Sequence, residues 1–274
     1  MDLLVKKNII FTTCFFRLQD WNCKSPEQYL RLFIQLCQTK INLVVYTSNC
    51  YYDKVKQIAL EYPNVLLIIK MELDDLNTAK QVKQRGTNIK LPTIRNLEKD
   101  TMSYYICMNS KIELVAKTLD MGNKGIIPFA RNYAWIDFGI FHIFKIPEIT
   151  SKKLSRLSEY SFPENFISFP GCILSQPIFQ RIMNEYIIWR FCGGFFIIAE
   201  TQLQKYHNII MQYLENNIAS GHLTWEVNIW AAVEQIYHLD FGWYLADHDD
   251  SIIDIPSISS SKIEFSNLKK DDTK

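Results

Sequence analysis

Long apolar runs and an excess of one charge are both missing from this sequence of 274 residues. Its longest apolar stretch, residues 191–199, is about half of the roughly 18 residues that a membrane-spanning helix requires. Lys and Arg (30 residues) nearly balance Asp and Glu (29 residues), and the net charge of +1 disfavours a nucleic-acid-binding protein. The N-terminal residues also lack the apolar core of a signal peptide, so we expect a cytoplasmic enzyme, with peripheral association with a membrane still allowed.

The sequence also lacks cysteine motifs. Seven cysteines occur, an odd number, and none lies in a CxxC pair or in a zinc-like group of four. Reduced thiols buried in the core are therefore expected, since free cysteine is among the most buried residue types. The sequence also contains neither a GxGxxG nor a Walker A motif, so it lacks the common dinucleotide and P-loop signatures.

The sequence does contain an alternation of apolar strands and amphipathic helices over residues 1–70. Strands are predicted at residues 8–13, 43–46 and 65–69. A helix is predicted between the first two strands, where Ser25 and Gln28 form a capping-box pattern. Continuous apolar strands joined by helices are typical of a parallel sheet that is covered on both faces. The predicted fold class is therefore α/β, with a Rossmann-like, mostly parallel sheet and helices on both faces.

Polar residues near the carboxyl ends of the first two strands are the first candidate binding site. Ligands of such sheets bind outside the carboxyl ends of the strands. Thr12, Thr13 and Tyr46 occupy these ends in the sequence. We therefore expect these three residues to contact a nucleotide, specifically a uridine or guanosine diphosphate.

The pattern beyond residue 70 is less regular. Residues 72–101 are polar and are expected to form loops or short helices. Periodicity and capping residues predict three more helices, at residues 103–119, 200–218 and 225–239. Three more strands are predicted at residues 133–137, 192–198 and 241–245. Thr224 is the expected N-cap of the last helix.

The domain organisation is predicted to be simple. We expect one domain over residues 1–255, which is a common length for an unbroken α/β domain. Its nucleotide-binding half would be residues 1–140 and its acceptor half residues 141–255. The polar, lysine-rich residues 256–274 are expected to form a disordered tail.

The segment Trp-Ile-Asp-Phe-Gly at residues 135–139 is the sharpest feature of the sequence. It places Asp137 at the end of a predicted strand and before a glycine, where a carboxylate can hold a divalent metal or a ribose. An aspartate that caps a turn is the alternative. Asp-Phe-Gly also occurs in protein kinases, but a kinase requires a glycine-rich loop and an upstream histidine motif, and neither is present.

Short motifs follow one another in a definite order along the chain, namely residues 12–17 (TTCFFR), Tyr29, 45–47 (VYT), 103–105 (SYY), 108–111 (MNSK), 134–139 (AWIDFG), 193–195 (GGF) and 224–230 (TWEVNIW). In order and spacing they resemble the HtrL/YibB-like protein family over nearly all of residues 8–250. The resemblance implies a GT-A-like fold and a glycosyltransferase of surface glycan or lipopolysaccharide-type synthesis. It also implies an acidic motif at Asp137 that binds Mn²⁺ or Mg²⁺, although the usual DxD pair is absent because Trp135 and Gly139 occupy the flanking positions.

Further positions complete a candidate transferase site, and each has a plainer structural alternative. Lys111 could pair with a pyrophosphate or be a solvated helix residue. Gly193 and Gly194 could let backbone N–H groups approach a sugar or phosphate, or could form a tight turn. Glu226 could be the acceptor base, a sugar ligand or an acid favoured at a helix N-terminus. His248 could be a second metal ligand or a polar loop residue.

Together these residues predict transfer of a sugar from a nucleoside diphosphate sugar to a glycan acceptor. A cation bound by Asp137, with His248 and Lys111, would stabilise the charge of the leaving diphosphate. Asp137 and Glu226 are the predicted catalytic residues. A non-catalytic GT-A-like binding module and a metal-dependent phosphate hydrolase are the alternatives that the sequence leaves open.

Overall fold

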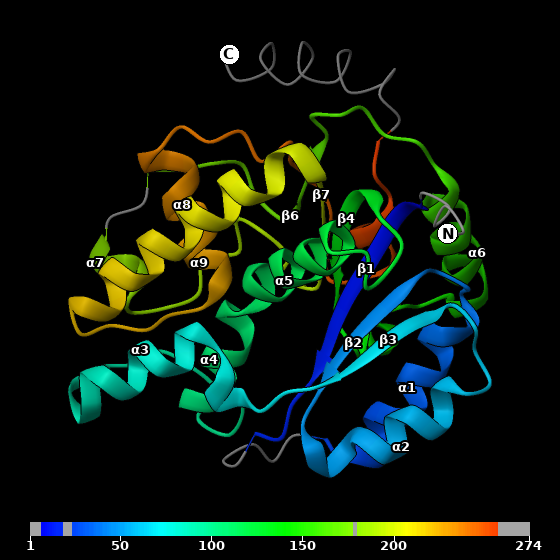
Figure 1. Ribbon diagram of the computed structural model, residues 1–274. Coiled ribbons are helices and arrows are strands. Elements are labelled where there is room, and N and C mark those ends of the chain that lie inside the picture. Colours follow the sequence, from blue (N-terminus) through cyan, green and yellow to red (C-terminus); the bar gives the residue numbers. More distant parts are fainter. Residues whose placement is uncertain (1–6, 19–23, 178–179, 257–274) are drawn as a thin grey trace, which may run out of the picture.

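The computed structural model describes residues 7–18, 24–177 and 180–256. Their centre is a six-stranded sheet (Figure 1). In spatial order its strands are β3 (Val65–Lys70), β2 (Leu43–Thr47), β1 (Lys7–Phe15), β4 (Ala130–Ile136), β7 (Phe195–Ala199) and β5 (Ile167–Ser168). The strands from β3 to β4 are parallel, whereas β7 is antiparallel to both of its neighbours. The predicted α/β class with a mostly parallel sheet is therefore confirmed.

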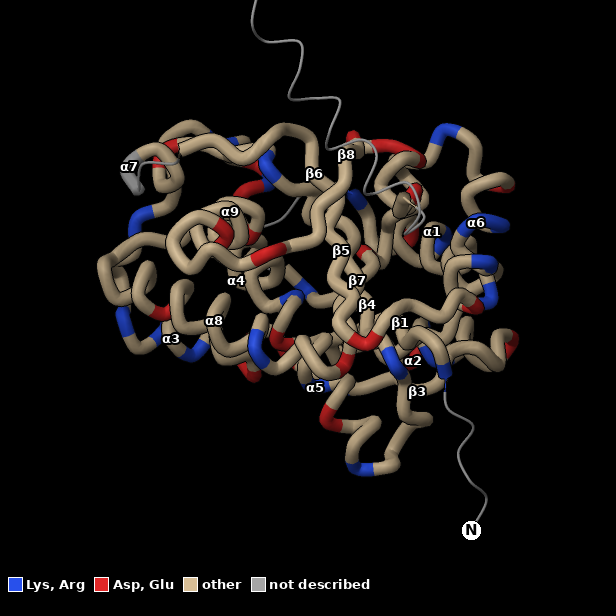
Figure 2. The backbone as a smooth tube through the Cα atoms, turned by 90° about the horizontal axis from the view of Figure 1, so that it is seen from above, with Lys and Arg blue, Asp and Glu red and all other residues tan. Residues whose placement is uncertain are grey.

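Helices cover both faces of this sheet, as the view in Figure 2 shows. One side carries α1 (Pro26–Gln38), α2 (Asn49–Ala59) and α6 (Pro147–Glu159). The other side carries α3 (Asn77–Arg85), α4 (Met102–Asn109), α5 (Lys111–Asn123), α8 (Glu200–Ala219) and α9 (Glu226–Ile236). Shorter elements are α7 (Gln180–Met183), the parallel pair β6 (Pro170–Gly171) and β8 (Tyr244–Leu245), and the 3₁₀ helices η1 (Leu73–Asp75), η2 (Gly86–Asn88), η3 (Ile140–His142) and η4 (Asp250–Ile253).

The two faces of the sheet form two separate cores, because side chains alternate between the faces along each strand. In β1, Ile10 belongs to the core on the side of α5 and α8, whereas Ile9 and Phe11 belong to the core on the side of α1 and α6. All three side chains are fully buried. A strand that is buried on both faces needs this continuous apolar sequence, which explains why β1 shows no polar alternation.

The start of α1 follows the local signal in the sequence. The Ser25 side chain accepts a hydrogen bond from the backbone N–H of Gln28, and the Gln28 side chain accepts one from the backbone N–H of Ser25. These reciprocal bonds satisfy two backbone donors that the first helical turn leaves unpaired. The predicted capping box is confirmed.

The helix predicted over residues 103–119 is in fact two helices that meet at Ser110. Ser110 has φ −88° and ψ 0°, outside the helical range, and its hydroxyl donates to the carbonyl of Ile106 at 2.8 Å. Serine side chains compete for backbone carbonyls in this way, which weakens a continuous helix. The break makes Lys111 the first residue of α5.

The last part of the chain departs from the prediction in two further places. The hydroxyl of Thr224 donates to the carbonyl of Met183 at 2.6 Å, and Trp225 takes the N-cap position of α9 without a side-chain hydrogen bond. The strand expected over residues 241–245 is limited to β8, which pairs with two residues of β6. Tertiary hydrogen bonds therefore override the local capping signal at Thr224.

Three expectations concern features at the scale of the whole chain. Among the described helices, none is both long and apolar enough to cross a membrane. Of the predicted tail, residues 257–274 lie outside the described part of the chain. The division into a nucleotide-binding half and an acceptor half stays a prediction.

Candidate functional site

A cavity of about 560 Å³ lies at the carboxyl ends of β1 and β4. Cys14, Phe15 and Phe16 at the end of β1 line it, together with residues 137–140 after β4. The first residues of α5 and α9 and the glycine pair before β7 also reach it. The cavity therefore collects residues from both halves of the chain.

Asp137 directly follows β4, and its backbone N–H donates to the carbonyl of Gly194 at 2.9 Å. Its side chain is about one-third exposed (33%), and Oδ1 accepts a hydrogen bond from Nε1 of Trp135 at 2.7 Å. Residues two apart on a strand lie on the same face, which brings these two side chains together. The turn after the strand is closed by the main-chain carbonyl of Asp137, which accepts from the N–H of Ile140. The side chain is therefore not a turn cap.

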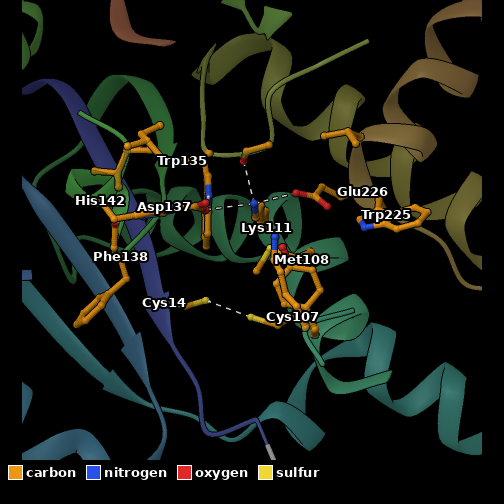
Figure 3. Close-up of a pocket in the computed structure, with 18 of the residues that line it drawn as sticks. Cys14, Cys107, Met108, Lys111, Trp135, Asp137, Phe138, His142, Trp225 and Glu226 are labelled. Atoms are coloured by element: carbon orange, nitrogen blue, oxygen red, sulfur yellow. Dashed lines mark hydrogen bonds and ion pairs between the residues drawn. The ribbon is translucent and has the colours of Figure 1, made fainter. Parts of the chain in front are cut away.

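Lys111 links the two carboxylates of the site (Figure 3). Its Nζ lies 2.8 Å from Oε1 of Glu226, 2.8 Å from the carbonyl oxygen of Gly193 and 3.2 Å from Oδ1 of Asp137. Only 1% of the residue is exposed, so these three acceptors replace the water that the ammonium would otherwise bind. Lys111 is therefore not the solvated helix residue of the plainer alternative.

The charge state of Lys111 follows from its surroundings. Burial by itself lowers the pKa of the ammonium, but the charges of Asp137 and Glu226 and their hydrogen bonds outweigh burial and raise the pKa above its usual value. Lys111 is therefore a permanent cation at neutral pH. It holds two carboxylates that would otherwise repel each other, and both of these residues line the cavity.

Gly193 and Gly194 contribute to the site through their backbone carbonyl groups and through the space that their missing side chains leave. The Gly193 carbonyl accepts from Lys111, and the Gly194 carbonyl accepts from the backbone N–H of Asp137. A Cβ atom at Gly193 would lie 2.2 Å from Oε1 of Glu226 and 3.3 Å from Nζ of Lys111. The missing side chain is thus what allows Glu226 and Lys111 to meet, while the predicted contact between the glycine N–H groups and a ligand stays a prediction.

We expect Gly193→Ala to destabilise the fold by roughly 1–3 kcal/mol, the usual cost of overpacking a buried site. The new methyl group would displace the Glu226 carboxylate from Lys111. Gly194→Ala is the matched control, because its Cβ would meet a methyl group of Ile140 at 3.0 Å and no carboxylate within that distance. Chemical denaturation of both variants measures the difference, and equal losses would contradict this account of Gly193.

His248 lies on the same cavity in the segment that leads into η4. Its ring contacts Trp189 edge-to-face, with ring centroids 4.6 Å apart. Burial lowers the pKa of His248, although the nearby charges of Asp137 and Asp247 oppose the shift. The imidazole is therefore neutral at pH 7 and can accept a hydrogen bond or bind a metal. The next residue, Asp249, fixes the segment by pairing with Lys145 at 2.8 Å.

The predicted metal site is incomplete when only protein ligands are counted. Within residues 7–18, 24–177 and 180–256, no group of three or more His, Cys, Asp or Glu side chains could hold a metal ion. Oδ1 of Asp137 is already bonded to Trp135 and Lys111. Of the two predicted metal ligands, Asp137 keeps Oδ2 and His248 keeps its ring, and both residues line this cavity. Magnesium and manganese often bind through one or two protein ligands together with substrate phosphates, so metal binding by Asp137 and His248 stays a prediction.

The structure corrects the placement of Thr12, Thr13 and Tyr46. All three are fully buried and none lines the cavity. The hydroxyls of Thr12 and Tyr46 instead meet that of Thr118 in α5, at 2.9 and 3.2 Å. The reason is that β1 extends to Phe15, two residues past its predicted end, so the binding edge is formed by later residues.

Several cavity residues were not predicted as site residues. Trp135 could have been found, because it lies two positions before Asp137 on the same strand. Cys14 and Cys107, whose Sγ atoms are 3.7 Å apart, lie beside the ion-pair cluster in Figure 3. Trp189 and Tyr104 also line the cavity. Cys14 and Tyr104 lie within the motif segments 12–17 and 103–105, whereas Cys107 and Trp189 lie outside these motifs. No local signal singles out any of the four, so the tertiary structure identifies them.

Comparisons with known proteins give weak similarities. No family model matches the sequence, and no curated protein matches it, so membership of the HtrL/YibB-like family stays a prediction. Mouse xyloside xylosyltransferase 1 is 9% identical, with 89% of this chain and 86% of that chain covered and a TM-score of 0.40. The 4-diphosphocytidyl-2C-methyl-D-erythritol synthase of Anaerococcus prevotii is 10% identical, with 96% and 98% covered and a TM-score of 0.41. A cytidylyltransferase of Leptospira borgpetersenii is 14% identical, with 88% and 75% covered and a TM-score of 0.37. Identities and TM-scores this low assign no function to this chain. A function has to be argued from the side chains of the site.

Proposed function

We propose that the protein transfers a sugar from a nucleoside diphosphate sugar to a glycan acceptor. The observation that carries this proposal is the fixed cluster of Asp137, Lys111 and Glu226 in a cavity at the carboxyl ends of parallel strands. Parallel α/β sheets bind their ligands at this edge. The cavity volume, about 560 Å³, lies within the range of small-ligand sites, roughly 300–1,000 Å³.

The side chains of the cluster have distinct proposed roles. Lys111 keeps both carboxylates in place, and because their charges offset its own, a diphosphate leaving group would rely on a bound cation for charge compensation. Glu226 has Oε1 bound to Lys111, which leaves Oε2 to accept a hydrogen bond from a hydroxyl group. This arrangement supports Glu226 as a sugar ligand more directly than as the acceptor base. Aromatic side chains around the cavity, including Trp135 and Trp189, offer faces for a base or a sugar ring.

A divalent metal, Mn²⁺ or Mg²⁺, would be held by Asp137 and His248 together with the phosphates of the donor. It would offset the charge of the leaving diphosphate. Because the chain supplies two donors, we expect metal affinity to be low alone and to rise when a nucleoside diphosphate is present. Without a metal, the cluster of one ammonium and two carboxylates carries a net charge of −1, which would not favour a bound diphosphate.

Calorimetric titration with nucleoside diphosphates, with and without Mn²⁺, tests the proposal. At least one diphosphate should bind, and at about one hundred times its Kd it should stabilise the fold by about 2.7 kcal/mol. The nucleoside monophosphate and the free sugar are the matched control ligands, and both should bind more weakly. Failure of every diphosphate to bind, with metal present, would contradict the proposal.

Turnover distinguishes the alternatives. A transferase with bound donor and no acceptor should slowly release free sugar and nucleoside diphosphate. Release of inorganic phosphate would instead support a metal-dependent phosphate hydrolase. Binding without any turnover, even with a range of glycan acceptors, would support a non-catalytic binding module.

A further inference from the structure

The segment from residue 80 to residue 99 is far more basic than the rest of the chain. It contains six Lys or Arg residues and one Glu, a net charge of +5 in a protein whose total is +1. Five of the six basic side chains are exposed, while Arg95 is half-buried and donates to the backbone carbonyls of Pro92 and Asp100. Figure 1 places α3, where this segment begins, at the end of the molecule toward which β1 runs. The cavity lies at that end.

Large apolar side chains are exposed in the same segment. Ile94 is 67% exposed and Leu97 is 71% exposed. The backbone N–H of Ile94 donates to the carbonyl of Glu185 at 2.9 Å, which fixes the segment beside residues 185–189. That neighbour adds Tyr186 and Trp189, each about 40% exposed. We name these four residues the apolar rim.

The apolar rim and the basic segment each contribute one residue to the lining of the cavity. Lys99 of the basic segment and Trp189 of the apolar rim are these residues. Exposed aliphatic and aromatic side chains interspersed with lysines are typical of surfaces that lie at a membrane interface. A polyanion such as a nucleic acid would be bound by the charges alone and would gain nothing from exposed Ile94 and Leu97.

We propose that the apolar rim and the basic segment dock on the surface of a bilayer that contains anionic lipids. The lysines match the negative surface charge of such a bilayer, and the rim enters its interfacial layer. Docking in this way places the mouth of the cavity against the lipid headgroups. The proposal goes beyond the proposed reaction and does not depend on it, because vesicle binding requires no turnover.

Co-sedimentation of the full chain with vesicles tests this surface. Vesicles of phosphatidylcholine and phosphatidylglycerol should bind the protein, vesicles of phosphatidylcholine alone should bind it weakly, and added salt should reduce binding. Replacing both Lys83 and Lys90 by Gln should weaken binding by about fivefold for each lysine. Lys124→Gln with Lys152→Gln is the matched control, since these lysines are also exposed but lie outside the segment.

A matched pair of variants tests the apolar contribution to vesicle binding. Leu97→Ser should weaken vesicle binding several-fold even at high salt, whereas Leu60→Ser should leave it unchanged. Leu97 and Leu60 are equally exposed, at 71%, so neither change should affect folding. Equal losses for the two variants would overturn the proposal. Equal binding to both kinds of vesicle would also overturn it. So would full competition by an oligonucleotide combined with no effect of Leu97→Ser, because those two results together indicate a site for polyanions.

Discussion

Asp137→Asn is expected to reduce sugar transfer by about 10²–10³-fold, the usual loss when one electrostatic contact to a developing charge is removed. The melting temperature should change little. Asparagine keeps an oxygen that can accept the hydrogen bond from Trp135, and the turn after β4 is closed by the main chain. What changes is the charge of the oxygen that faces the cavity.

Activity and thermal denaturation should be measured on the same preparation. Asp120→Asn is the control, because it removes an exposed carboxylate at the far end of α5 and should leave both quantities unchanged. Metal-dependent binding of a nucleoside diphosphate should also be lost in Asp137→Asn. Normal transfer by this variant would remove Asp137 from the mechanism, and most of the proposed transferase chemistry with it.

Lys111→Met is expected to lower the free energy of unfolding by about 3–5 kcal/mol. Methionine fills much of the same volume, so the main cost is electrostatic. The side chain of Glu226 is 7% exposed and would lose the partner of its carboxylate. Asp137, which is more exposed, would lose the same partner at smaller cost.

Urea denaturation measures the change in the free energy of unfolding, and two further variants test its cause. Lys54→Met breaks the pair with Glu27, whose side chains are more than half exposed, and should have no measurable effect on stability. Adding Glu226→Gln to Lys111→Met removes the unpaired charge and should recover part of the loss. If Lys111→Met and Lys54→Met behaved alike, the ion pair would not be a source of stability.

The elements that were predicted correctly depend on short stretches of sequence. The capping box of Ser25 and Gln28 involves residues three apart, and the strand predicted at residues 133–137 overlaps β4 in four of its five residues. Strand length was harder to predict. β1 continues past Thr13 because Cys14 and Phe15 still pair with β2, and no local signal marks that end.

The arrangement of the site was beyond prediction for a different reason. Lys111 and Glu226 are 115 positions apart, and each has an ordinary local environment at the start of a helix. Lys111 begins α5 because the hydroxyl of Ser110 donates to the carbonyl of Ile106. This side-chain bond competes with the backbone hydrogen bonds of a continuous helix, and the outcome of that competition is not visible in the sequence. Candidate residues could thus be named one by one, but the contacts between them depend on the packing of α5, α9 and the glycine pair that precedes β7.

The distance along the chain between Lys111 and its partners also bears on how the protein is made. During synthesis α5 emerges well before Gly193 and Glu226 exist, and an ammonium cannot be buried without acceptors. Lys111 must stay in water until α9 has left the ribosome. The opening strands and helices can form earlier, but the face of the sheet that carries α5 closes only after α9 has emerged.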